Sequence, residues 1–307
     1  MRPIHLLASV LILIVAGACT SSERDGTSTT EYTDDIGRTV RIADPAERIV
    51  TLAPNLTEIV FAAGAGDRLV GVTTADDYPP EVQTLPRISA VPVDFESVAL
   101  LRPDVVLATD QVNSPKDAAS FESLDVPVYF FHFTSLEDIF AAIEVTGKIA
   151  GTAERAASHA ATLRQALEDL KERTNPVANP PRVLFLISDE KLFGFGRGSY
   201  IHEIIRAAGG ESVSADEELP APVFNDEYVV EQQPDVIVGS FPPEVDAETL
   251  LKLHPAWGTV PAIRNDRVYA VNPDIVLRPG PRAIEGAYRL ALILHPELLG
   301  SGSSATG

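Results

Sequence analysis

Two stretches decide the fold: Glu96-Ser-Val-Ala-Leu-Leu-Arg-Pro103-Asp104-Val-Val-Leu and, later in the chain, Glu227-Tyr-Val-Val-Glu-Gln-Gln-Pro234-Asp235-Val-Ile-Val. In each, a Glu opens a short helical segment, and a Pro-Asp pair and an apolar β-branched run follow at the same interval. Such a run after a helix is typical of a strand buried on both faces of a parallel α/β sheet. We predict two similar lobes, each with one glutamate in a related setting. Repetition within an ordinary α/β domain is the alternative.

Composition sets the size of the protein and limits its partners. The chain has 307 residues, of which 45% are hydrophobic, so it is long enough for two domains that each bury a core. Its formal net charge is −20 and its pI about 4.6. Polyanions repel such a protein, which argues against nucleic acid or an anionic membrane surface as a direct partner.

The amino terminus has the architecture of a bacterial lipoprotein signal. Arg2 supplies a basic start, an apolar run follows over residues 6–15, and the small residues 16–18 precede Cys19. A plain secretory signal and a transmembrane anchor are the alternatives. The apolar run is shorter than the roughly 20 residues that a membrane-spanning helix needs.

We therefore predict that residues 1–18 are a signal peptide, that Cys19 is the lipidated residue, and that residues 19–33 form a flexible polar tether. The folded part is expected outside the cytoplasm, in the periplasm or on the cell surface, with the lipid as its only membrane attachment. Cys19 is the only cysteine of the sequence, so neither an internal disulfide nor a thiolate metal cluster can form.

Strand and helix patterns alternate along most of the remaining chain. We predict an N-terminal α/β lobe over residues 34–151, a linking helix over 152–174, a C-terminal α/β lobe over 175–300 and a disordered tail over 301–307. The linking helix would be roughly 30 Å long, about the diameter of a domain. Its length predicts a rigid strut between the lobes, and hence a small closure on ligand binding.

These features together resemble a known family, the substrate-binding proteins of bacterial ABC importers for vitamin B12, iron-siderophores and haem that have a rigid helical backbone. The resemblance covers nearly all of the mature chain. It implies an α/β fold of two Rossmann-like lobes with parallel sheets, joined by the backbone helix, with the ligand cleft between the lobes. The stretches that carry it are Arg48 to Glu58, Gly71-Val-Thr with Asp77-Tyr-Pro-Pro80, Phe95 to Leu107, Gly209-Gly-Glu211, Asp235 to Val238, and Trp257 with Arg267-Val-Tyr269.

The resemblance also implies a partner. In this family one surface glutamate on each lobe docks into an arginine pocket on each of two permease subunits, and Glu96 and Glu227 hold the matching positions. Two charge-assisted contacts between carboxylate and arginine would fix the orientation of the complex. The alternative is that each glutamate only favours its helix N-terminus. The chain is expected to act as a monomer.

The loops most resemble the cobalamin-binding branch, so the expected ligand is a corrinoid, with an iron-siderophore or haem as the alternative. Ligands of parallel sheets bind beyond the carboxyl ends of the strands. Aromatic walls and a few polar groups suit a corrin disc, and burial in the core is the alternative for each aromatic. The candidate ligand-binding residues are Pro54, Asn55, Asp77, Tyr78, Gln111, Phe131, Phe193, Phe195, Asp274 and Arg278, with Phe133 as a further candidate wall. An anionic siderophore would need more clustered cations than these loops offer.

Other functions have weaker support. The sequence has no nucleophile elbow, phosphate loop or His-Glu-x-x-His motif, so we predict neither catalysis nor a protein-held cofactor or metal. A zinc or manganese carrier would need convergent histidines, whereas the histidines here are scattered. His132 alone follows a strand end, where it would either face the cleft or be a satisfied structural residue. A signalling or adhesive lipoprotein remains the last alternative.

Overall fold

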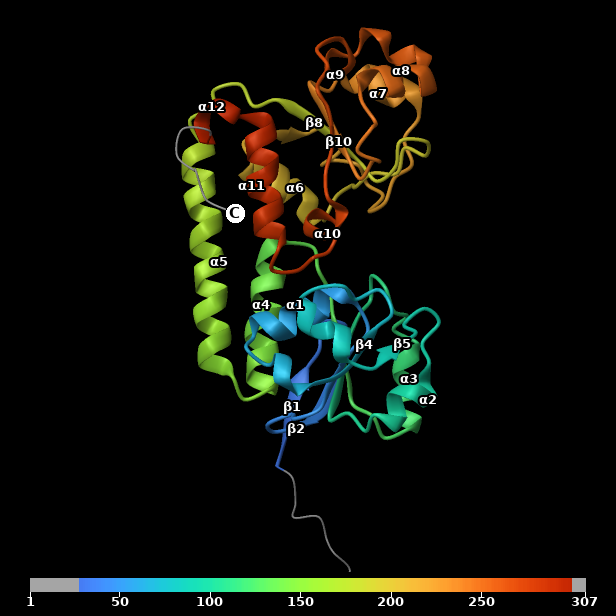
Figure 1. The fold of residues 1–307 in the computed structure, drawn as a ribbon, viewed down its shortest axis with the longest axis vertical. Helices are drawn as coiled ribbons and strands as arrows, with labels where there is room; N and C mark the ends of the chain where they lie inside the picture. Colours follow the sequence, from blue (N-terminus) through green and yellow to red (C-terminus); the bar gives the residue numbers. More distant parts are fainter. Residues whose placement is uncertain (1–27, 300–307) are drawn as a thin grey trace, which may run out of the picture.

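The computed structural model describes residues 28–299. Two α/β lobes lie one above the other along the long axis, and the helix α5 (Ala153–Thr174) runs beside both of them (Figure 1). Each lobe has a parallel sheet. The predicted fold class, two parallel α/β lobes with a long backbone helix, is confirmed.

The N-terminal lobe is built on a five-stranded parallel sheet in the order β5-β4-β3-β6-β7. All five residues of the interior strand β6 are buried, which explains the uninterrupted apolar run in the first quoted stretch. Its strands are β3 (Ile49–Thr51), β4 (Leu69–Thr73), β5 (Arg87–Ile88), β6 (Val105–Thr109) and β7 (Val128–Phe131). Its helices are α1 (Pro54–Ala62), η1 (Gly66–Arg68), η2 (Pro80–Thr84), α2 (Phe95–Leu100), α3 (Asp117–Ser123) and α4 (Leu136–Ile149).

The C-terminal lobe repeats this arrangement with four parallel strands in the order β11-β10-β8-β9. Read from the other edge, the order β9-β8-β10-β11 matches β4-β3-β6-β7 in chain order, so the predicted internal repeat extends to sheet topology. The strands are β8 (Arg182–Leu186), β9 (Glu211–Ser212), β10 (Val236–Gly239) and β11 (Val268–Ala270). The helices are α6 (Tyr200–Ala207), α7 (Asp226–Gln232), α8 (Ala247–Leu253), η3 (Pro255–Thr259), α9 (Pro261–Arg264), α10 (Pro273–Val276), α11 (Ala283–Leu294) and α12 (Pro296–Leu299).

A hairpin precedes the first lobe. Strands β1 (Thr29–Thr33) and β2 (Thr39–Ala43) pair antiparallel around a turn that contains Gly37 at φ 86°. The prediction of a flexible tether is therefore wrong for residues 29–33, because their backbone groups pair with β2. The turn covers the edge strand β7, where the Asp35 N–H donates to the Phe130 carbonyl at 3.0 Å.

The helix α5 packs against α1 and α4 of one lobe and α6 and α11 of the other. It approaches α4 so closely that a Cβ at Gly147 would lie 2.2 Å from the Cβ of Ala156. Its range agrees with the predicted strut to within one residue. A capping box that joins Ser135 and Asp138 starts α4.

Several predictions concern residues outside the described part of the chain. They are the signal peptide, the lipidated Cys19, residues 19–27 of the tether and the tail over 301–307. Among residues 28–299, no helix combines the length and the apolar composition needed to cross a bilayer. Within the same residues, no group of three or more histidine, cysteine or acidic side chains is arranged to hold a metal ion.

Candidate ligand and docking sites

Each lobe presents one exposed glutamate at the start of a short helix. Glu96 and Glu227 are the second residues of α2 and α7. Asp94 and Asn225 cap these helices by accepting the backbone N–H of the residue that follows the glutamate, at 3.0 and 2.8 Å. Both helices lie on the side of the molecule away from α5 (Figure 1). The two carboxylates therefore occupy equivalent positions.

The ends of the two helices are also equivalent. Each helix is followed by a left-handed residue directly before the proline, Arg102 at φ 48° and Gln233 at φ 45°. The side chain of Arg48 donates to the Arg102 carbonyl and to the carbonyl before it, at 3.0 and 2.6 Å. Arg182 donates twice to the carbonyl before Gln233, at 3.2 and 2.9 Å. One arginine per lobe thus satisfies helix-end carbonyls that would otherwise lack partners.

The aspartate of each Pro-Asp pair completes the unit. Asp104 accepts the backbone N–H of Arg48 at 2.9 Å and that of the preceding residue at 2.8 Å. Asp235 accepts the backbone N–H of Arg182 at 2.9 Å. Carboxylates that accept backbone N–H groups make strong hydrogen bonds, so the motif fixes the helix to the first strand of its lobe.

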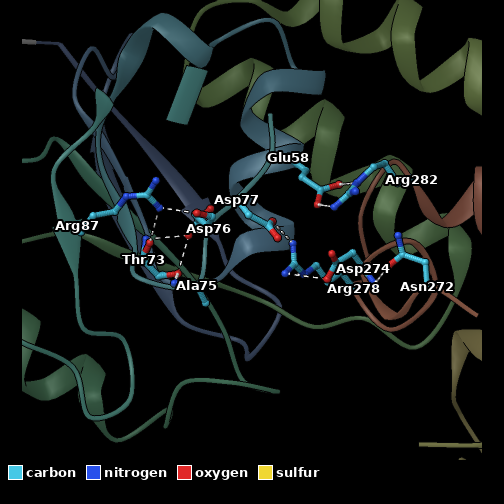
Figure 2. Close-up of polar contacts among 10 residues, drawn as sticks. All are labelled: Glu58, Thr73, Ala75, Asp76, Asp77, Arg87, Asn272, Asp274, Arg278 and Arg282. Atoms are coloured by element: carbon cyan, nitrogen blue, oxygen red, sulfur yellow. Dashed lines mark hydrogen bonds and ion pairs between the residues drawn. The ribbon is translucent and has the colours of Figure 1, made fainter. Parts of the chain in front are cut away.

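The second region is the contact between the lobes (Figure 2). The carboxylate of Glu58 on α1 accepts two hydrogen bonds from the Arg282 guanidinium, at 2.6 and 2.9 Å. Close by, Arg278 bridges the lobes by pairing with Asp77 at 2.6 Å and with Asp274 of its own lobe at 2.9 Å. We call these five residues the interlobe clasp.

Burial and charge differ between the two halves of the clasp. The Glu58 side chain is 2% exposed, and this burial raises the pKa of its carboxyl although Arg282 opposes the shift. The Asp77 side chain is 54% exposed, and the hydrogen bond from Arg278 lowers the pKa of its carboxyl. An unpaired charge destabilises a protein far more when it is buried than when it is exposed. The pair of Glu58 with Arg282 is therefore the half of the clasp that matters most for stability.

The predicted polar contacts come together only in part. Asp77, Asp274 and Arg278 meet in the clasp. Asn55 is 4% exposed, and its amide donates to the Pro279 carbonyl at 3.2 Å, so in this conformation it joins the lobes. Its neighbour Pro54, which is half-buried, opens α1. Gln111 lies elsewhere in the N-terminal lobe, exposed after β6, and donates to the Phe133 carbonyl at 2.8 Å.

The predicted aromatic walls divide into three groups, which are exposed, half-buried and buried. Tyr78 is 44% exposed and Phe193 is 38% exposed. Phe195 is half-buried and packs on the main core. The prediction of a wall is wrong for Phe131, and likewise for Phe133, because each is 1% exposed and the two rings stack on each other within the core. All four residues of β7 are buried, and beyond it Phe133 returns to the core although His132 between them is exposed.

Tyr78 is held from behind by the clasp. The Arg282 guanidinium lies 4.3 Å from the centre of the Tyr78 ring, while its nitrogens bind Glu58. Attraction between a cation and an aromatic face orients the ring, and the buried carboxylate keeps the cation in place. The exposed face of Tyr78 is therefore positioned rather than free to rotate.

Sequence reasoning missed the role of Glu58 and of Arg282. A signal was present, because Glu58 sits within the apolar run of α1, and a buried carboxylate requires a cation. No local pattern indicates which cation pairs with it, because Arg282 lies 224 residues away along the chain. His132 was the open case, and its Nδ1 lies 2.8 Å from the Asp110 carboxylate with the side chain 47% exposed.

A groove of about 850 Å³ lies apart from these residues, between α4, α5 and α6. Its lining includes Leu136, Phe140, Leu167 and Glu203 but none of the predicted ligand residues. The Glu203 carboxylate spans it by accepting the Leu136 N–H at 2.8 Å, so the groove belongs to the packing of the strut against both lobes.

The protein has two lobes with parallel sheets, one helix that joins them, and strand-end loops that meet between them. This arrangement is typical of substrate-binding proteins that serve importers. The sequence profile of the family described as "Periplasmic binding protein" matches residues 49–275, and the chain belongs to this family. The family resemblance drawn from the sequence is confirmed.

Named relatives narrow the class. The chain is 32% identical over 253 residues to the vitamin B12-binding protein of Vibrio cholerae serotype O1, covering 81% of this chain and 90% of that one. It is 30% identical over 270 residues to YvrC of Bacillus subtilis, an uncharacterized ABC transporter substrate-binding lipoprotein, covering 86% of this chain and 85% of that one.

Solved structures agree on the fold. The crystal structure of the periplasmic vitamin B12 binding protein BtuF of Vibrio cholerae superposes with a TM-score of 0.71 at 32% identity, over 82% of this chain and 98% of that one. The periplasmic heme-binding protein RhuT from Roseiflexus sp. RS-1 also gives 0.71, at 27% identity, over 82% of this chain and 99% of that one.

Proposed function

We propose that this protein captures a corrinoid between its lobes and delivers it to the permease of an ABC importer. The observation that carries the proposal is the similarity over most of both chains to proteins named for vitamin B12 binding. The site supports it. Tyr78 and Phe193 offer exposed aromatic surface, and Asp77, Asp274 and Arg278 offer polar groups.

The charge of the site favours a corrinoid over an anionic siderophore. Arg278 and Arg282 are both paired with carboxylates of the clasp, so neither offers an unneutralised positive charge to a ligand. A broad, mostly uncharged disc edged with amides instead matches aromatic surface with a few hydrogen-bonding groups.

Titration calorimetry with cyanocobalamin, with haem and a ferric siderophore in parallel, tests the proposal. We expect cyanocobalamin alone to bind with submicromolar affinity. Tyr78→Ala and Phe193→Ala should each weaken binding about tenfold, because each removes stacking surface. Leu292→Ala, which truncates an exposed side chain on α11, is the matched control and should bind as the wild type does. Binding of a siderophore alone would refute the ligand assignment and keep the transport role.

Haem is the second candidate ligand, favoured by the likeness to RhuT and by one residue. His132 lies directly after β7 with its side chain 47% exposed, so its ring is accessible to a haem iron. A haem Soret shift that disappears in His132→Ala, together with no binding of cyanocobalamin, would establish haem in place of the corrinoid.

We further propose that Glu96 and Glu227 dock on the two permease subunits. Their equivalent, exposed positions at the starts of α2 and α7 support this.

The likeness to a substrate-binding lipoprotein supports lipidation at Cys19. Mass spectrometry of the mature protein should find diacylglycerol on Cys19, and Cys19→Ala should release the protein from membranes. The chain would act as a monomer without a cofactor of its own.

A further inference from the structure

One buried histidine connects two segments that the proposed function uses separately. His254 follows α8 and is 9% exposed. Its Nδ1 lies 2.8 Å from Oδ1 of Asp226, and its Nε2 lies 2.9 Å from the Asp189 backbone carbonyl. The ring stacks on Trp257 with centroids 4.3 Å apart, and the indole N–H donates to the same Asp226 oxygen at 3.0 Å.

The chemistry of these partners restricts the state of the ring. A backbone carbonyl and an ionised carboxylate both accept hydrogen bonds only, so His254 makes both bonds when each ring nitrogen carries a proton. His254 thus bridges two backbone segments through hydrogen bonds and does more than fill space in the core.

The two segments differ in their expected roles. Asp226 is the first residue of α7 and directly precedes the docking residue Glu227. Asp189 belongs to the loop after β8, which returns through a hydrogen bond from the Ile187 N–H to the carbonyl of Phe193 at 2.8 Å. Phe193 is the exposed aromatic that we assign to the ligand. One side chain therefore spans from the ligand loop to the docking helix.

The N-terminal lobe lacks an equivalent connection among the described residues of its docking helix. There, α2 is supported by an apolar contact, in which Phe95 meets Phe121 edge to face at 4.9 Å. The side chain of its cap, Asp94, bonds with Ser97 of the same helix, and the Asp94 backbone N–H donates to the Ser89 carbonyl at 3.0 Å. In that lobe a buried amide, Asn113, reaches the Leu52 carbonyl at 3.5 Å and the Ala90 carbonyl at 3.3 Å, but these contacts end before α2. The polar side-chain link that reaches the docking helix itself is found in the C-terminal lobe.

We propose that His254 is a positioning residue that couples ligand binding to the docking helix α7. The inference rests on the proposed function. When the ligand contacts Phe193 it restrains the Asp189 loop, the bond from His254 to the Asp189 carbonyl becomes persistent, and the same ring then holds Asp226 and the first turn of α7 in place. The hydrogen bond from His254 to the Asp189 carbonyl is therefore the element with two states, and ligand binding favours the state in which the bond is made.

Hydrogen exchange of the purified protein, with and without cyanocobalamin, tests the coupling. In the wild type we expect ligand to slow exchange of the α7 amides about fivefold, because α7 opens locally less often when its first turn is held. Glutamine has one amide group in place of the two ring nitrogens, so His254→Gln cannot bridge both acceptors as the histidine does. In this variant the ratio of α7 exchange rates without and with ligand should fall to about one, and ligand affinity should stay within about threefold of wild type. The α2 amides should not respond to ligand in either protein.

A purely structural role predicts a different result. His254→Gln would then speed α7 exchange equally with and without ligand, and an unchanged ratio overturns the proposal. Trp257→Phe is the matched control, since it removes one bond to Asp226 and leaves the histidine bridge, so it should keep the ligand response.

If His254→Gln does not fold, Asp226→Asn retains an acceptor without its charge and should weaken the response. A wild type that binds none of the three chelates refutes the proposed function and this inference together. Binding with an unchanged ratio refutes the inference alone.

Discussion

The two lobes share one frame and differ in what lies behind α2 and α7, the helices that we propose dock on the permease. In both, an Asx cap, an arginine at the helix end and the aspartate of a Pro-Asp pair fix a short helix to the first strand. Behind α2 lies an apolar contact, and behind α7 lies the polar cluster of His254, Asp226 and Trp257. The shared part sets where a carboxylate is presented. The part that differs determines whether that carboxylate is linked to a ligand loop.

The clasp joins the two lobes through a buried ion pair between Glu58 and Arg282. Arg282→Met should lower the free energy of unfolding by about 3–5 kcal/mol, because it leaves the Glu58 carboxylate buried without a cation. Urea denaturation measures the loss. Arg289→Met is the control, since its pair with Glu285 is an exposed one on α11 and should contribute about 0.5 kcal/mol or less. Equal losses would show that the clasp is not a buried ion pair in solution.

The shared frame predicts a graded effect at the two Pro-Asp pairs. Asp104→Ala should cost about 2 kcal/mol and Asp235→Ala about 1 kcal/mol, because the first carboxylate accepts two backbone N–H groups and the second accepts one. Urea unfolding of the two variants gives the order. Asp67→Ala, at an exposed side chain in a weak 3.9 Å pair, should have little effect. A larger loss at Asp235 would break the equivalence of the units.

A permease-binding assay on variants of Glu96 and Glu227, the proposed docking residues, tests whether the two lobes differ in function. Glu96→Gln and Glu227→Gln should each weaken binding to the permease in nanodiscs about tenfold, and the double variant about a hundredfold, because distant sites act independently. Glu154→Gln on α5, on the other side of the molecule, is the control. The loss at Glu227 should be greater with ligand bound than without, whereas the loss at Glu96 should be the same in both states.

The smallest expected effect is at the exposed half of the clasp. Asp77→Asn should cost less than about 1 kcal/mol at pH 7, because solvent screens an exposed pair. The pKa of Asp77 is lowered in the folded protein, so its contribution is present above the unfolded pKa and is lost as pH falls through the folded value. The difference in unfolding free energy between wild type and variant should therefore vanish in strong acid. A difference that persists there would mean that the carboxylate acts by shape rather than charge.

Much of the fold could be predicted because it depends on local patterns. Buried runs such as Val105 to Leu107 and the Pro-Asp pairs mark interior strands, and the long helical segment over residues 152–174 marks α5. The two-residue strands β5 and β9 gave no pattern, since their pairing depends on neighbouring strands. Residues 29–33 were assigned to the tether because polar Thr-rich sequence does not reveal that a partner strand lies after the next turn.

The candidate site was predictable only in part, for a different reason. Asp77, Asp274 and Arg278 follow strand or helix ends, and topology alone brings such loops together. Whether an aromatic faces a ligand or the core depends on rotation about one strand end, which left Phe131 and Tyr78 indistinguishable in sequence. The partners of Glu58 and of His254 lie far away along the chain, so their bonds exist only in the folded protein.

The helix α5 has a consequence for how such a protein can diversify. It touches both lobes through α1, α4, α6 and α11, and none of the predicted ligand residues lies on it. The separation of Glu96 and Glu227, the proposed docking residues, is therefore set by a part of the chain that carries none of the predicted ligand contacts. Substitutions in the strand-end loops can change the cargo while the geometry offered to the importer stays constant, so specificity and delivery can evolve at separate rates.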